Sequence, residues 1–374
     1  MHHVDTLFPR DSFRAHSDID EALLEGLNPA QRAAVAHDYG PLLIVAGAGS
    51  GKTRVLTHRI SYLIRAREVS PFQILAITFT NKAAAEMRER VGHLVGDRLG
   101  QAMWVMTFHS ACGRILRKEA QRLGYTSSFT IYDGSDSERL IGYCMRDLDV
   151  DTKRLTPKAV RTAIGRAKDE LIDEESYAQR AENFIDKQVA DVYRLYQQRL
   201  RAANAMDFDD MINNVVHLFR LFPEVLTAYQ DKFRHVLIDE FQDTNGAQFE
   251  LAKLLASRDR NICVVGDADQ SVYAFRGADF RNVMRFEDEF PDATVIVLEQ
   301  NYRSTQTILD AANAVIGRNR MRKPKSLWTD AGAGAPILRY HAESEMDEAM
   351  YVAQEVERLR EEDDRTYNDV AVFY

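Results

Sequence analysis

The sequence has few cysteines, no long apolar run and no excess of positive charge. Its three cysteines, Cys112, Cys144 and Cys263, lie far apart without paired spacing. This excludes a disulfide scaffold or a cysteine zinc site and indicates a reducing compartment. No apolar run approaches the roughly 20 residues of a membrane-spanning helix, and charges interrupt every apolar stretch near the N-terminus, so no signal peptide is predicted. We therefore expect a cytoplasmic protein without a membrane partner.

The charge balance restricts how a nucleic acid could be bound. The formal net charge is -9 over 374 residues, so a nucleic-acid partner would have to lie in a local groove rather than on a generally positive surface. A chain of this length exceeds a typical single domain, and we expect two compact units and a tail.

Short, nearly continuous apolar runs alternate with helical patterns along much of the chain. Strands that are apolar on both faces are typical of a parallel sheet covered by helices, which predicts an α/β fold. The predicted strands lie at 41–46, 74–79, 103–108, 235–239, 262–266 and 294–298.

The same pattern predicts the domain boundaries. Residues 1–25 lack periodicity and are expected to form a mobile tail. The sheet domain is expected at 26–133 and 206–300, interrupted at 134–205 by an all-helical subdomain. Residues 301–374 are expected to begin a second α/β unit, with a strand at 337–341 and another at the C-terminal end. Because nothing follows to cover that last strand, we expect the chain to stop inside a domain.

A glycine-rich loop joins the first predicted strand to a helix. Residues 46–53 read Ala-Gly-Ala-Gly-Ser-Gly-Lys-Thr, and such glycines let backbone N–H groups and the helix start face phosphate oxygens. Lys52 is then placed to reach the terminal phosphates, and the Thr53 hydroxyl to bind Mg²⁺. Ala46 stands where such loops usually have their first glycine, and a turn that only caps a helix is the simpler alternative. The loop residues expected to hold the phosphates are Ala48, Gly49, Ser50 and Gly51.

A pair of carboxylates at the end of a later strand complements this loop. Asp239 follows the run at 235–238 and suits a metal-water ligand, while Glu240 can orient or deprotonate an attacking water. Two adjacent acids are more often a solvated loop, but the preceding buried strand favours a site for hydrolysis.

Seven short motifs occur in an order and spacing that resemble the UvrD/Rep/PcrA group of superfamily 1 DNA helicases, from about residue 27 to 309. The resemblance implies a RecA-like P-loop NTPase sheet with an inserted helical subdomain and the start of a second RecA-like domain. The motifs lie at 27–32, 78–83, 107–110, 239–243, 266–273, 275–279 and 300–304.

The resemblance also assigns residues to the nucleotide. It implies that Gln31 hydrogen-bonds the adenine edge, that Tyr302 stacks on the base and that Arg54 lies beside the nucleotide. Gln270 would sense the γ-phosphate, and Arg303 would stabilise the charge that develops there. Without the resemblance, Gln31 and Arg303 would be taken for exposed surface residues, and Tyr302 for a half-buried aromatic.

Single-stranded DNA requires aromatic platforms for bases and polar groups for the backbone. The resemblance makes Phe79, Tyr273 and Phe275 the platforms, although the family usually has tryptophan where Phe275 stands, which would weaken stacking. A core position is the alternative for Phe79. The residues expected near the DNA backbone are Thr78, Asn81, Thr107 and His109.

Two charged clusters have competing interpretations. The acids at 207–210 could form a second metal centre, but a helix N-cap is the favoured reading. The basic run at 151–168, opposed within that stretch only by Asp151, could bind duplex phosphates or could be a solvated helix face. Its members are Lys153, Arg154, Lys158, Arg161, Arg166 and Lys168.

Together these features predict an ATP- and Mg²⁺-dependent DNA helicase or translocase. The resemblance implies 3′ to 5′ movement on single-stranded DNA and at single-strand/duplex junctions, in repair or replication restart, by a monomer that meets DNA-repair proteins. Because the family's second motor domain continues beyond residue 374, this chain alone is expected to be an incomplete motor. The alternatives are a DNA-binding ATPase module without unwinding, the motor part of a helicase-nuclease, and an interaction-only remnant.

Overall fold

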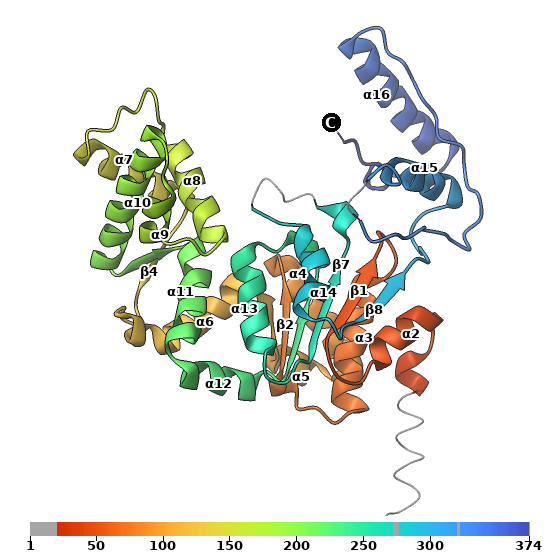
Figure 1. Ribbon diagram of the computed structural model, residues 1–374. Coiled ribbons are helices and arrows are strands. Elements are labelled where there is room, and N and C mark those ends of the chain that lie inside the picture. Colours follow the sequence, from red (N-terminus) through yellow and green to blue (C-terminus); the bar gives the residue numbers. More distant parts are fainter. Residues whose placement is uncertain (1–20, 272–276, 320–321, 374) are drawn as a thin grey trace, which may run out of the picture.

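A six-stranded parallel sheet forms the centre of the molecule (Figure 1). The computed structural model describes residues 21–271, 277–319 and 322–373. The strand order is β3-β2-β6-β7-β1-β8, and all six predicted strands occur, which confirms the α/β fold class. Their bounds are β1 Leu42–Ala46, β2 Ile74–Thr78, β3 Trp104–Thr107, β6 His235–Ile238, β7 Ile262–Gly266 and β8 Thr294–Leu298.

Alternate residues of each strand enter two separate cores, one on each face of the sheet. Leu43 and Val45 pack into one core, and Leu42 and Ile44 into the other. Burial on both faces explains why most residues of these strands are apolar. The helices of the sheet domain are α2 Pro29–Ala36, α3 Lys52–Arg65, α4 Asn81–Val95, α5 Asp97–Ala102, α6 Phe108–Glu119, α11 Phe208–Leu221, α12 Pro223–Lys232, α13 Gly246–Ala256 and α14 Arg281–Glu289.

A helical subdomain projects from the sheet domain, at the left of Figure 1. It has a core of its own, in which the rings of Tyr193 and Tyr196 are fully buried. A two-stranded parallel sheet of β4 (Thr130–Tyr132) and β5 (Ala205–Asp207) joins its two connections to the sheet domain. Its helices are α7 Gly134–Asp147, α8 Pro157–Asp169, α9 Glu174–Arg180 and α10 Phe184–Ala202.

The C-terminal segment differs from the prediction. It contains α15 (Gln306–Ile316) and α16 (Glu345–Glu362), but residues 337–341 and 370–373 are not strands. Both stretches have exposed apolar side chains, such as Leu338 and Phe373. A β-strand exists only through hydrogen bonds to a neighbouring strand, and within the described residues neither stretch has one.

The described chain begins before the boundary that we expected near residue 25. Residues 21–24 are helical, and Leu23 is buried in the core on the α3 face of the sheet. No described helix is long and apolar enough to cross a membrane.

Candidate functional site

The loop between β1 and α3 is shaped to receive an anion. Gly49 and Gly51 have φ angles of 70° and 85°, the left-handed region that glycine adopts without steric cost. Helix α3 begins at Lys52 without a side-chain cap and without an acidic residue in its first turn. Its first N–H groups are therefore left for an external acceptor, which is the usual arrangement for phosphate binding.

The carboxylates after β6 lie against this loop. The Lys52 ammonium is 2.6 Å from Glu240 Oε2 and 3.5 Å from Gln270 Oε1. Gln242 also donates to Glu240 Oε2, at 2.9 Å. Three of the predicted site residues, from three separate strand ends, thus surround one point at the carboxyl edge of the sheet.

Asp239 is almost completely buried beside the loop. Burial and the neighbouring charge of Glu240 raise its pKa to about 6, and Lys52 and a hydrogen bond from Thr53 oppose that rise. A buried carboxylate of this kind is stabilised by any cation that arrives.

The donor atoms here fit Mg²⁺. Thr53 offers a hydroxyl and Asp239 a carboxylate, and Mg²⁺ typically uses one or two carboxylates together with water and substrate phosphates. The described part of the chain holds no cluster of three or more histidine, cysteine or acidic side chains that could bind a metal.

Two of the residues predicted to contact the base, Gln31 and Tyr302, are hydrogen-bonded to the same loop. Gln31 is 1% exposed; its Oε1 accepts from the Asn28 N–H at 3.1 Å, and its Nε2 donates to the Ser50 carbonyl at 3.0 Å. Tyr302 is half exposed, and Asn28 Nδ2 donates to its hydroxyl at 3.0 Å. Gln31 is therefore buried and hydrogen-bonded to the loop, and it is not the exposed surface residue that the sequence alone would suggest.

The segment after β8 is bonded directly to the loop. Asn301 Nδ2 donates to the Ala48 carbonyl at 2.6 Å, and the Tyr302 N–H donates to the Gly49 carbonyl at 2.9 Å. Arg303 is exposed next to Gly49. Arg54 is also exposed, with its guanidinium close to Gly26.

A pocket of about 240 Å³ lies where β2 and β3 end, beneath the helical subdomain. Four of the residues predicted to bind DNA line it: Thr78, Phe79, Thr107 and His109. Asn81 is exposed at the start of α4. The predictions for Tyr273 and Phe275 concern positions outside the described residues.

The rings of Phe79 and His109 line this pocket and also pack against other aromatic side chains. Phe79 is only partly buried; it packs on the core and meets Phe108 edge-on at 5.9 Å. His109 meets Phe208 edge-on at 5.6 Å. Burial lowers the pKa of His109, so it is neutral at neutral pH and offers hydrogen bonds rather than charge.

Three carboxylates in this pocket, those of Asp169, Asp209 and Asp243, were not predicted as site residues. Burial raises the pKa of Asp169 and Asp243 to about 6 and, together with the charge of Asp207, that of Asp209 to about 7. Asn245 donates to Asp169 at 2.5 Å, which links the end of α8 to the sheet domain. Asp243 belongs to the motif at 239–243, but no local pattern marked Asp169.

The acids at 207–210 form a helix cap, as favoured. Asp207 caps α11 in a reciprocal pair with Asp210. The same two carboxylates bind Lys168, at 2.6 and 2.7 Å. Lys168 is 1% exposed, so the prediction that it belongs to a surface run, whether DNA-binding or solvated, was wrong. An acidic residue outside 151–168 also offsets the positive charge of the run, because Glu138 of α7 lies 3.5 Å from Arg161.

Two family models match the chain. Residues 27–291 match the UvrD/REP helicase N-terminal domain, and residues 296–374 match the UvrD-like helicase C-terminal domain. The chain is 57% identical to the ATP-dependent DNA helicase UvrD1 of Mycobacterium tuberculosis over 95% of its own length and 47% of the relative. It is 49% identical to the ATP-dependent DNA helicase PcrA of Staphylococcus epidermidis, over 94% of the chain and 48% of the relative. The chain thus spans about half the length of the curated relatives it matches.

Proposed function

Since the chain belongs to the UvrD/REP helicase family, we propose that it forms the nucleotide-binding part of an ATP-driven DNA helicase. The supporting observation is the convergence of two distant segments: Lys52 lies 2.6 Å from Glu240, and Thr53 hydrogen-bonds Asp239. A phosphate-binding loop and a carboxylate pair at one sheet edge are the parts that hydrolysis of a nucleoside triphosphate requires.

We assign roles according to position in this arrangement. The loop N–H groups and Lys52 bind the phosphates, and Thr53 and Asp239 would hold Mg²⁺, whose charge helps to neutralise the phosphate oxygens when it is bound. Glu240 orients the attacking water and accepts its proton. Gln270 contacts the terminal phosphate, Arg303 stabilises charge on it, and Gln31, Arg54 and Tyr302 surround the base.

For DNA, we propose that a single strand crosses the pocket at the ends of β2 and β3. Phe79 would offer a ring for base stacking, while Thr78, Asn81, Thr107 and His109 would meet the backbone by hydrogen bonds. Several carboxylates line the pocket, and Lys168, the cation in its lining, is paired with Asp207 and Asp210. The pocket therefore favours contacts with bases and uncharged groups over contacts with many phosphates.

The finer features rest on the resemblance and on the relatives, whose names describe ATP-dependent DNA helicases. We propose 3′ to 5′ movement, action at single-strand/duplex junctions and a role in DNA repair or replication restart. A monomer that acts in the cytoplasm and meets DNA-repair proteins fits this role.

ATP hydrolysis by the chain, with and without a single-stranded oligonucleotide, tests the proposal. We expect stimulation by the oligonucleotide and loss of hydrolysis in Lys52→Ala, whereas Lys187→Ala, which alters an exposed lysine of the helical subdomain, should leave the rate unchanged. Hydrolysis that persists in Lys52→Ala would refute the site. A strand-separation assay distinguishes a helicase from an ATPase module that binds DNA without unwinding it.

A further inference from the structure

A buried lysine of the C-terminal segment reaches the nucleotide site from outside the sheet domain. Lys325 Nζ lies 2.5 Å from Asp267 Oδ1 and 2.5 Å from Asp269 Oδ2. The three side chains are only 3 to 5% exposed. Buried charges are tolerated when they are paired, so this triad fixes Lys325 in the turn after β7.

Asp267 connects Lys325 to the predicted phosphate sensor. Its second carboxylate oxygen, Oδ2, accepts a hydrogen bond from Gln270 Nε2 at 2.5 Å. The other end of the same amide, Oε1, faces Lys52 at 3.5 Å. A side-chain amide has two N–H donors and an acceptor oxygen. With one N–H on Asp267, the amide is held in one orientation, and the second N–H stays free to donate.

Asp267 depends on Lys325 more than Asp269 does. Asp269 has additional partners in the same segment, with Arg322 at 3.4 Å and Asn319 at 3.3 Å. Among the described residues, Lys325 is the cation that pairs with Asp267. Without it, the buried carboxylate of Asp267 would lose its counter-charge and would turn away, which would release the Gln270 amide.

We propose that Lys325 is a positioning residue for recognition of the terminal phosphate. It holds Asp267, which orients Gln270, so that the response of the site to a γ-phosphate depends on the position of the C-terminal segment. This inference rests on the proposed function, because it assigns a phosphate contact to Gln270. It adds a physical link between that contact and the C-terminal segment.

A comparison of the affinities for a nucleoside diphosphate and a nucleoside triphosphate distinguishes a positioning role of Lys325 from a purely structural one. We would measure binding of ADP and of the non-hydrolysable analogue AMP-PNP to the 374-residue chain and to Lys325→Met. The ratio of AMP-PNP to ADP affinity should fall about tenfold, as for loss of one charge-assisted hydrogen bond, while ADP affinity is kept. Lys323→Met is the matched control, because Lys323 pairs with Glu287 and not with Asp267, and it should leave the ratio unchanged.

Thermal unfolding of each variant accompanies the binding data. If Lys325→Met does not fold, Lys325→Gln, which keeps a hydrogen-bond donor, must show the same direction of change. Equal loss of both affinities, or an unchanged ratio in a folded Lys325 variant, overturns the positioning role. Failure of the unsubstituted chain to bind either nucleotide would instead refute the proposed function.

Discussion

The ammonium group of Lys52 is bonded to the carboxylate of Glu240 across 188 positions of sequence, at 2.6 Å. The Lys52 side chain is 10% exposed and that of Glu240 36%. An entering phosphate would compete for the lysine and release the carboxylate, so we expect the pair to couple phosphate binding to the supply of a base.

Replacement of Glu240 by glutamine should separate binding from hydrolysis. The variant keeps the size of the side chain but removes the proton acceptor, so we expect the ATP hydrolysis rate to fall about 10²- to 10⁴-fold. Nucleotide affinity should be kept or increased, because Lys52 loses its competing partner. Single-turnover hydrolysis and equilibrium binding check this, and a parallel loss of affinity would contradict the role of Glu240.

Acidification should weaken the Mg²⁺-dependent part of nucleotide binding. The pKa of Asp239 is raised to about 6, so the side chain becomes protonated as the pH falls from 7 to 5 and loses its capacity as a ligand. The effect on folding has the opposite sign. Between its unfolded pKa of 3.8 and about 6 the folded chain binds more protons, so Asp239 contributes stability at low pH that is lost as pH rises.

ADP affinity measured from pH 5 to 7, with Mg²⁺ and with chelator, isolates the metal-dependent part. Asp239→Asn should remove the pH dependence of that difference. A difference that stays constant with pH in the unsubstituted chain would argue against Asp239 as a ligand.

Phe79→Leu should weaken binding of single-stranded DNA with little loss of stability. Leucine replaces the part of the ring that packs on the core, at a cost usually below about 1.5 kcal/mol, but it offers no face for stacking, which is worth about 1–3 kcal/mol per base. Fluorescence anisotropy with an oligonucleotide, alongside thermal unfolding, distinguishes the two roles. Unchanged affinity with a large fall in melting temperature would assign Phe79 to the core alone.

Lys168→Met should destabilise the junction of the helical subdomain and the sheet domain. Loss of one partner from a buried ion pair typically costs about 3–5 kcal/mol, because Asp207 and Asp210 are left without a cation. The loss should be larger at pH 7 than at pH 5, where one of the acids can be protonated. Denaturant unfolding measures the loss in the free energy of unfolding. Adding Asp207→Asn to the Lys168→Met chain should recover part of that loss.

Arg166→Met serves as the control for this substitution, since Arg166 is exposed on the same helix. It should change the free energy of unfolding by no more than about 0.5 kcal/mol. If Lys168→Met were equally mild, the buried cluster would not stabilise this junction.

The strands and the phosphate-binding loop could be predicted because their signals are local. The inner strands of the sheet, such as β1 and β7, are buried along their whole length, so most of their residues must be apolar. The turn before Lys52 needs residues that adopt positive φ, and Gly49 and Gly51 supply them. Helix caps are local in the same sense, which is why the reading of Asp207 as an N-cap was correct.

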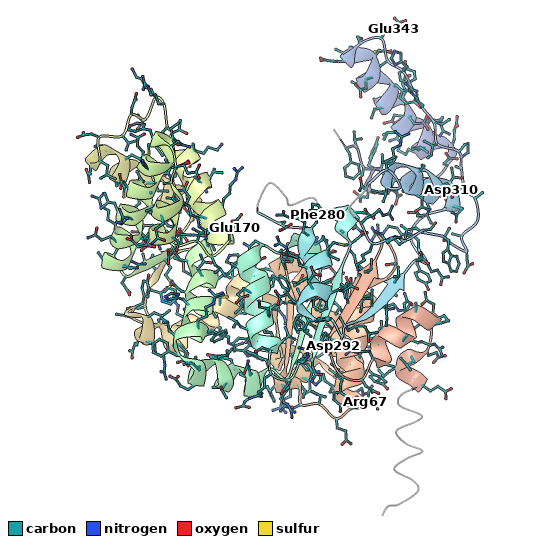
Figure 2. The ribbon with its side chains drawn as sticks, viewed as in Figure 1. Arg67, Glu170, Phe280, Asp292, Asp310 and Glu343 are labelled. Carbon is teal, nitrogen blue, oxygen red and sulfur yellow. The ribbon has the colours of Figure 1, made fainter. Side chains whose placement is uncertain are left out.

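The burial of Lys168 in α8 could not be predicted, because it depends on which residues lie beside it in three dimensions. From the sequence, Lys168 was taken for a member of a basic surface run. In the structure it is buried against the carboxylates of Asp207 and Asp210, at the start of α11 in the sheet domain. In Figure 2, Glu170 at the end of α8 lies where the helical subdomain meets the sheet domain. No pattern along the chain predicts which charges meet at such a boundary.

The sequence by itself determined the sheet, the phosphate-binding loop and the family. The apolar strands, the glycines of the loop and the order of the motifs can all be recognised from the residue types at neighbouring positions. Only the tertiary structure decided that Lys325 pairs with Asp267 and that residues 337–341 pair with no strand among those described. Both outcomes depend on contacts between segments distant in the chain, and such contacts are set by how whole elements pack rather than by any local preference.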